Sequence, residues 1–136
     1  MPLASAECEC GYTLNYDHEK PVFFTDLLES NFEKMATVDI GANTDWNRQE
    51  YNITAEKSSG PYGKIMDVRN VELIPSSEFE PQKRVLKLVV DSVIVDGMVS
   101  NAEMASNRND IMHGTFSVSM KTTDIPGTCQ AFFWVA

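Results

Sequence analysis

Residues 114–121 alternate between apolar and polar side chains, and no other stretch limits the possible folds of this chain as strongly. In an extended backbone, Phe116, Val118 and Met120 fall on one side, while Ser117 and Ser119 fall on the other. A period of two residues predicts a strand with one buried face and one face in water.

A second strand is expected at residues 129–135, where Phe132, Phe133 and Trp134 follow one another. Pro126 and Gly127 lie between the two stretches and signal a tight turn. We therefore predict that residues 114–121 and 129–135 form an antiparallel hairpin.

The rest of the chain predicts short extended segments and almost no helix. Residues 22–32 allow two interpretations: one helical turn followed by an extended run, which we favour, or a bent strand. Residues 58–63 form a turn cluster, and Asp96-Gly97 signals a hairpin or a bulge. Trp46 is read as a core anchor, with a ligand platform as the alternative. Strands are predicted around residues 12–14 and at 50–54, 65–74, 85–90 (central in a sheet) and 93–99. Residues 75–83 are predicted to be a polar loop, and residues 101–110 to be polar and exposed. This pattern is typical of an all-β sandwich.

Length and charge argue against several classes of protein. The 136 residues make one domain at most, and a hydrophobic fraction of 43% suffices for a globular core. A net charge of −9 opposes binding to nucleic acid or to an anionic membrane surface. No apolar run approaches the roughly 18 residues of a transmembrane helix. We expect no nucleic-acid partner, no membrane partner, no metal and no cofactor.

The three cysteines, Cys8, Cys10 and Cys129, are an odd number, so one is left over. No further ligand lies near Cys8 and Cys10, which argues against zinc. We predict one disulfide between the amino-terminal pair and Cys129, with Cys10 as the assigned partner, and this implies an oxidising compartment. Free thiols are the alternative.

Two features favour secretion. Residues 1–6 end in Ala4-Ser5-Ala6, which fits the end of a secretory signal and predicts that this segment is a signal remnant. Asn52-Ile53-Thr54 is an acceptor triplet for N-glycosylation, with Asn52 as the site.

Seven stretches resemble glycoside hydrolase family 16, and in particular its secreted fungal branch. They follow the family order from about Cys8 to Trp134, so residues 7–136 resemble part of a family 16 domain. The stretches are 9–12 (ECGY), 24–32 (FTDLLESNF), 44–46 (TDW), 60–64 (GPYGK), 95–104 (VDGMVSNAEM), 114–121 (GTFSVSMK) and 126–134 (PGTCQAFFW).

The resemblance implies an incomplete concanavalin-A-like jelly roll, in which two antiparallel sheets carry a glycan cleft across the concave one. Family members hydrolyse or transfer β-1,3- and β-1,4-glucans with retention, which requires two carboxyl groups about 5 Å apart. The family places them on one strand as Glu-x-Asp-x-Glu or Glu-x-Asp-x-x-Glu, because alternate side chains share a face. These 136 residues contain no Glu-x-Asp. We expect the amino-terminal part of a β-glucan hydrolase or transglycosylase that lacks the catalytic strand and is inactive alone.

The resemblance assigns three residues to glucan binding. Glu103 falls where lichenase-like members carry a glutamate that hydrogen-bonds sugar hydroxyls, although Ala105 stands where those members have arginine; a solvated strand residue is the alternative. Phe133 matches a cleft aromatic that would stack on a sugar ring. Trp134 faces the opposite way in a strand, so it is either a core residue or a further contact.

Two other functions stay open: a non-catalytic, lectin-like glycan-binding module and an oligomeric structural protein. A sandwich that lacks several strands exposes its inner faces. At ~25 cal/mol per Å² of apolar area, the missing burial lowers the free energy of unfolding by tens of kcal/mol, whereas a domain's net stability is only ~5–15 kcal/mol. We therefore expect self-association through uncovered strands, with β-glucan of the extracellular cell wall as the other partner.

Overall fold

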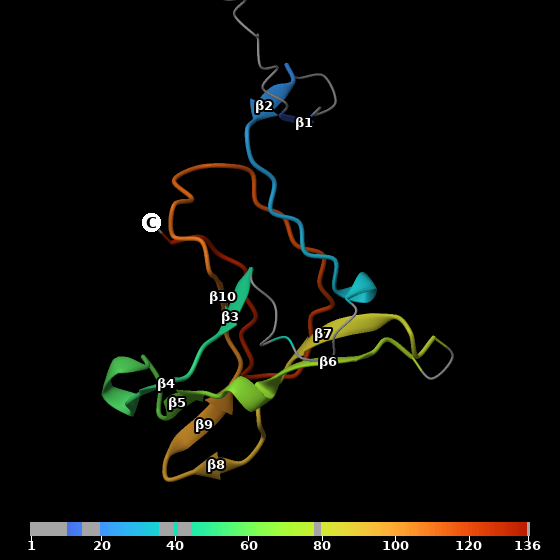
Figure 1. Ribbon diagram of the computed structural model, residues 1–136. Helices are drawn as coiled ribbons and strands as arrows, with labels where there is room; N and C mark the ends of the chain where they lie inside the picture. The colour runs from blue at the N-terminus through green and yellow to red at the C-terminus, as the bar shows by residue number, and fades with distance from the viewer. Residues whose placement is uncertain (1–10, 15–19, 36–39, 41–44, 78–79, 136) are drawn as a thin grey trace, which may run out of the picture. The chain divides into compact units, whose positions relative to one another are not determined.

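The computed structural model describes residues 11–14, 20–35, 40, 45–77 and 80–135 (Figure 1). These residues form ten short strands and a few single turns of 3-10 helix. The described part contains no α-helix, so the predicted all-β class is confirmed. The chain divides into two compact units, residues 1–30 and 31–136.

The first unit contains a two-stranded antiparallel sheet of β1 (Tyr12–Leu14) and β2 (Val22–Phe24), in which Tyr12 lies opposite Phe24. The extended segment at 12–14 is therefore confirmed. The favoured order for 22–32 is wrong, because the extended part comes first and pairs with β1. The helical turn, η1 (Phe32–Lys34), follows in the second unit, where the Asn31 side chain accepts a hydrogen bond from the Glu33 amide.

A four-stranded sheet in the second unit has the order β4–β5–β9–β8. Its strands are β4 (Tyr51–Ile53), β5 (Gly63–Met66), β9 (Met98–Asn101) and β8 (Ile94–Val95). The pair β5–β9 is parallel, whereas β4–β5 and β8–β9 are antiparallel. The expectation of wholly antiparallel sheets is wrong for this pair, because the long connection between β5 and β9 allows both strands to run the same way.

Two further antiparallel pairs belong to the second unit: β6 (Val71–Pro75) with β7 (Arg84–Leu88), and β3 (Trp46–Arg48) with β10 (Met104–Ser106). The single strand predicted at 65–74 is thus two strands, β5 and β6, separated by the 3-10 turn η4 (Val68–Asn70). The central position predicted for 85–90 is wrong, since β7 pairs only with β6 among the described residues. Residues 104–106 are half-buried rather than exposed because they pair with β3.

Of the hairpin or bulge predicted at Asp96-Gly97, the structure shows the hairpin, because β8 and β9 are antiparallel neighbours joined by these two residues. Both turn residues have positive φ, 50° and 72°, as a two-residue hairpin turn with the favoured twist requires. The strand predicted at 50–54 and the turn at 58–63 are also present as β4 and the β4–β5 connection.

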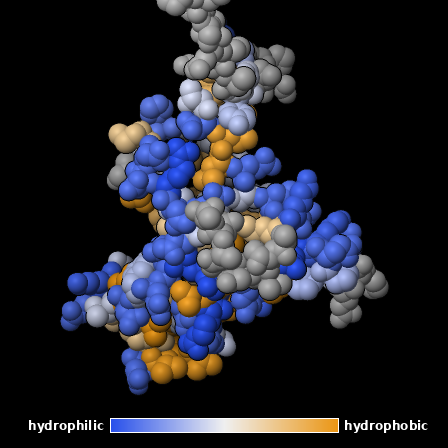
Figure 2. All heavy atoms as spheres, in the orientation of Figure 1, coloured by the Kyte–Doolittle hydropathy of each residue, from blue (hydrophilic) through white to orange (hydrophobic). Residues whose placement is uncertain are grey.

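The buried core of the described residues consists of Ile40, Val71 and Leu73. Val71 and Leu73 point inward from β6 while Glu72 between them is exposed, so period-two alternation explains this strand. Partly buried residues pack around the core: Phe32, Met35, Leu86, Ala102 and Met104. Many other apolar side chains face water, and Figure 2 shows such a group at the β8–β9 hairpin, where Val93, Ile94 and Val95 are exposed.

The prediction that residues 114–121 and 129–135 pair as an antiparallel hairpin is wrong. Neither segment is a strand, and in Figure 1 the chain after β10 runs to its end without an arrow. The connecting turn is present, with Gly127 at φ 86° and Thr128 donating its amide to the Ile125 carbonyl at 3.4 Å. The two segments meet through side chains instead, since the Trp134 ring stacks on that of Phe116. The Gln130 side chain bonds to the backbone of Thr123 in the turn.

Candidate functional site

The predicted binding residue Glu103 lies in the short connection between β9 and β10. Its carboxylate accepts a hydrogen bond from the hydroxyl of Tyr51, the first residue of β4, at 2.6 Å from oxygen to oxygen. The Glu103 carbonyl also accepts a hydrogen bond from the Gln49 amide at 3.0 Å. This backbone bond joins the β3–β4 connection, which contains Gln49, to the β9–β10 connection, which contains Glu103. The Tyr51 phenol and the Glu103 carboxylate therefore meet although 52 residues separate them in sequence.

Glu103 changes the chemistry of Tyr51. The hydrogen bond to Glu103, together with desolvation and the nearby negative charge, raises the pKa of Tyr51 to about 12. At neutral pH the pair is therefore a neutral hydroxyl beside a carboxylate, and Tyr51 is exposed to solvent. Because the Tyr51 proton is already donated to Glu103, the pair offers acceptor lone pairs on the phenol and carboxylate oxygens, and these suit the donating hydroxyls of a sugar.

The other two predicted binding residues lie near the end of the chain and are exposed. The Phe133 side chain is 67% exposed, and that of Trp134 is 42% exposed. Trp134 stacks on Phe116 with ring centroids 5.8 Å apart, and its indole N–H donates to the Ile111 carbonyl at 3.0 Å. Trp134 is thus outside the buried core, and a loop carbonyl already occupies its donor.

The structure does not bring all three predicted residues together. Glu103 contacts Tyr51, whereas the contacts of Trp134 are with Phe116 and Ile111. Tyr51 was not identified from the sequence, because nothing local marks it and its partner is distant along the chain. Trp46, the predicted core anchor, is half-buried in β3 and does not belong to the buried core.

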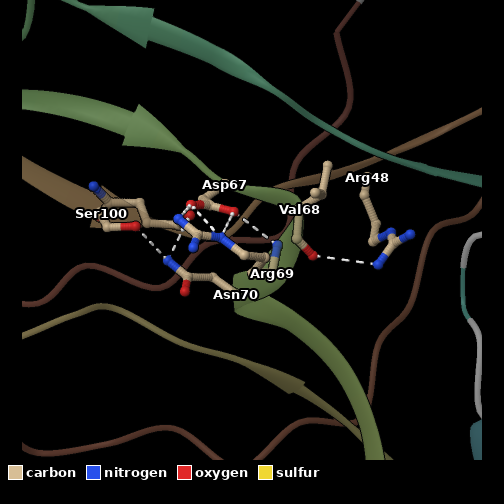
Figure 3. A network of polar contacts seen from close by, with 7 residues as sticks. Arg48, Asp67, Val68, Arg69, Asn70 and Ser100 are labelled. Atoms are coloured by element: carbon tan, nitrogen blue, oxygen red, sulfur yellow. Dashed lines mark hydrogen bonds and ion pairs between the residues drawn. The ribbon is translucent and has the colours of Figure 1, made fainter.

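A second polar cluster surrounds the turn η4 (Figure 3). The Asp67 carboxylate accepts from the Arg69 amide at 2.9 Å and pairs with the Arg69 guanidinium, which lowers the pKa of Asp67 to about 2. Asn70 donates from its side chain to the Ser100 hydroxyl at 2.8 Å and to the Asn101 carbonyl at 3.1 Å. These bonds join η4 to β9, and every group in them is engaged with the protein itself, so the cluster is structural.

A pocket of about 380 Å³ adjoins this cluster, and both Arg48 and Arg69 line it. Arg69 is paired with Asp67, and Arg48 donates to the Val68 carbonyl at 3.4 Å. Since both guanidinium groups are engaged, the pocket does not present a free cation to an anionic ligand. In the part of the chain that the structure describes, no group of three His, Cys, Asp or Glu residues could hold a metal ion.

The predicted modification sites are only partly within the described residues. Asn52 is exposed on β4, the outer strand of its sheet. Cys129 is exposed, and it forms no disulfide with another described residue. Cys8 and Cys10 lie outside the described residues, as does the predicted signal remnant at 1–6, so the Cys10–Cys129 disulfide stays a prediction. No helix among the described residues is long and apolar enough to cross a membrane.

Comparison with known proteins finds no matching family model, no matching curated protein and no matching solved structure. The function of this chain therefore has to be argued from its residues and their geometry.

Proposed function

We propose that this chain is the amino-terminal part of a secreted β-glucan hydrolase or transglycosylase of the family 16 type, and that its own contribution is to bind glucan. The observation that carries the proposal is the Tyr51–Glu103 pair, a neutral hydroxyl and a carboxylate 2.6 Å apart at a residue that the family resemblance assigns to sugar binding. The strands would belong to the jelly-roll sandwich that the resemblance implies.

The chemistry of the exposed side chains supports sugar recognition. Carbohydrate sites combine a few fixed polar groups with aromatic faces that cover the apolar side of the sugar ring. Tyr51 and Glu103 supply the polar groups of such a site, and Phe133 exposes a separate aromatic ring. The two carboxylate oxygens of Glu103 can accept hydrogen bonds from two neighbouring sugar hydroxyls in addition to the bond from the Tyr51 phenol.

Binding without cleavage is proposed for this chain because retention needs two carboxyl groups about 5 Å apart. The resemblance places both carboxyl groups on a Glu-x-Asp strand, and these 136 residues contain no Glu-x-Asp. The same point favours a non-catalytic, lectin-like module as the alternative function. Release of sugar products separates an enzyme from such a module.

Titration of the chain with soluble β-1,3-glucan and mixed-linkage β-1,3/1,4-glucan, followed by calorimetry, tests the proposal. Glu103→Gln should weaken binding roughly 10- to 150-fold, because a hydrogen bond to a charged group contributes about 1.5–3 kcal/mol. Glu56→Gln is the matched control, because it removes the same charge from an exposed residue in η3 (Ala55–Lys57). Absence of saturable binding by the unsubstituted chain, or equal loss in both variants, would contradict the proposal.

Secretion is proposed from the acceptor triplet, because Asn52 in the outer strand β4 and Thr54 just after that strand are both exposed. Expression through a eukaryotic secretory pathway should give a product whose mass falls on treatment with an N-glycosidase. Asn52→Gln should abolish that mass change, whereas Asn47→Gln, outside any acceptor triplet, should retain it.

A further inference from the structure

Residues 116–121 have the pattern of a strand but no strand partner among the residues that the structure describes. Their backbone makes no hydrogen bond to another described residue, although the segment has the alternation that suits a sheet. Phe116, Val118 and Met120 are 42–50% exposed. The segment therefore presents both a free backbone edge and a row of apolar side chains, which is what an added strand requires.

The sequence of this segment is self-complementary in one antiparallel register. If two copies pair with Val118 opposite Val118, then Phe116 faces Met120 and Ser117 faces Ser119 in each half. Apolar residues then meet only apolar residues, and hydroxyls meet only hydroxyls. A twofold axis through Val118 gives an isologous interface, the commonest arrangement of homodimers.

Charge also favours a second copy at this place. Of the 20 acidic and 11 basic residues of the chain, only Asp124 and Lys121 lie within residues 111–135. The remaining surface carries the net negative charge and repels another copy. The neutral stretch is thus the region where two such chains approach at the lowest electrostatic cost.

The exposed aromatic area is of the order that a dimer needs. Phe116, Phe132, Phe133 and Trp134 are 42–67% exposed. With about 200 Å² for each aromatic side chain, they leave roughly 400 Å² for burial. That is about half of the ~800 Å² that each partner contributes to a standard interface, before any aliphatic residue is counted.

We propose that this protein forms a twofold-symmetric homodimer in which residues 116–120 of two copies pair as antiparallel strands about Val118. The neighbouring exposed aromatics, including Trp134 stacked on Phe116, extend the contact. The dimer converts two unpaired edges into one continuous ladder and removes the apolar row from water.

Sedimentation velocity of the full chain over a wide concentration range tests the proposal. The unsubstituted protein should sediment as a reversible dimer, and Val118→Lys should raise the dissociation constant roughly a hundredfold or more, because two like charges then face each other at the axis. Ser117→Lys is the control with the same net charge, on the opposite side of the segment, and should change the constant much less. A monomer at every concentration, or equal effects of the two variants, would overturn the proposal.

Mixing two variants separates loss of the interface from loss of folding. Val118→Lys and Val118→Glu should each sediment as monomers, and an equimolar mixture should form a heterodimer, because opposite charges then face each other at the axis. Salt should weaken this heterodimer. Failure of the mixture to associate would overturn the proposed register.

Discussion

The hydroxyl of Tyr51 donates to the carboxylate of Glu103 at 2.6 Å, and this bond joins the start of β4 to the β9–β10 connection. It is supported by the backbone bond from the Gln49 amide to the Glu103 carbonyl. The phenol keeps its proton well beyond neutral pH because ionising it would place two negative charges side by side.

Tyr51 should ionise near pH 12, later than an ordinary tyrosine at about 10. Ultraviolet absorbance after rapid jumps to high pH measures the phenolates before the protein unfolds. Tyr51→Phe should remove the late phase, and Glu103→Gln should shift it toward lower pH. A late phase that persists in Tyr51→Phe would belong to a different tyrosine.

The same bond makes stability fall at alkaline pH. The pKa of Tyr51 is higher in the folded state than in the unfolded state, so the contribution is complete below about pH 10 and is lost between pH 10 and 12. Urea unfolding at several pH values should show a loss over this window that is smaller in Glu103→Gln. Glu56→Gln, which removes a carboxylate elsewhere, should keep the loss unchanged.

Asp67→Asn should lower the free energy of unfolding by about 1 kcal/mol at neutral pH, since it removes the capping of η4 and the pairing with exposed Arg69. The pKa of Asp67 is lowered to about 2, so its contribution is present above about pH 4 and is lost as the pH falls toward 2. Urea unfolding at pH 7 and pH 3 measures both effects. Asp124→Asn makes the same change in charge and should alter neither value by more than about 0.5 kcal/mol.

Gly63→Ala should destabilise the protein by about 1–3 kcal/mol. A Cβ at Gly63 would lie 2.1 Å from the Met98 sulfur and 2.7 Å from the Ile53 carbonyl oxygen, and the backbone atom cannot easily move away. Gly60→Ala is the matched control, because its Cβ would meet only the Ser58 carbonyl oxygen at 4.0 Å. The midpoint of thermal unfolding should be close to that of the unsubstituted protein for Gly60→Ala and lower for Gly63→Ala. A lower midpoint for Gly60→Ala than for Gly63→Ala would show that β4, β5 and β9 pack differently.

Val71→Ala should cost about 2 kcal/mol, because Val71 is 2% exposed and is central to the small core. Val90→Ala removes the same two methyl groups from an exposed position and should change the free energy of unfolding by no more than about 0.5 kcal/mol. Denaturant unfolding followed by circular dichroism compares the two. Equal costs would mean that Val71 lies outside the cooperative core.

Several elements were predictable because their signals are local. The Asp96-Gly97 turn demands positive φ at two adjacent residues, and few sequences other than this one satisfy it at low cost. The alternation Val71-Glu72-Leu73 sets which side chains of β6 are buried. The strands at 12–14 and 50–54 follow from β-branched and aromatic residues bounded by turn residues.

Other elements depended on partners that the sequence does not reveal. Residues 85–90 are apolar enough for a central strand, yet β7 has one neighbour, β6, among the described residues. Residues 101–110 read as polar and exposed, yet Met104 is half-buried because β10 pairs with β3, more than 50 residues earlier. Glu103 was identified through a family resemblance, whereas its partner Tyr51 was found only in three dimensions.

The sequence by itself determined the all-β class, several turns and the buried side of β6, because these depend on backbone dihedral preferences and on a two-residue period. The tertiary structure decided which strands pair, the parallel alignment of β5 with β9, and the meeting of Tyr51 with Glu103. It also placed residues 116–121 outside every strand of the described structure, although their alternation predicts one. Strand pairing is a contact between distant segments, and a local pattern specifies that a partner is needed but not which one.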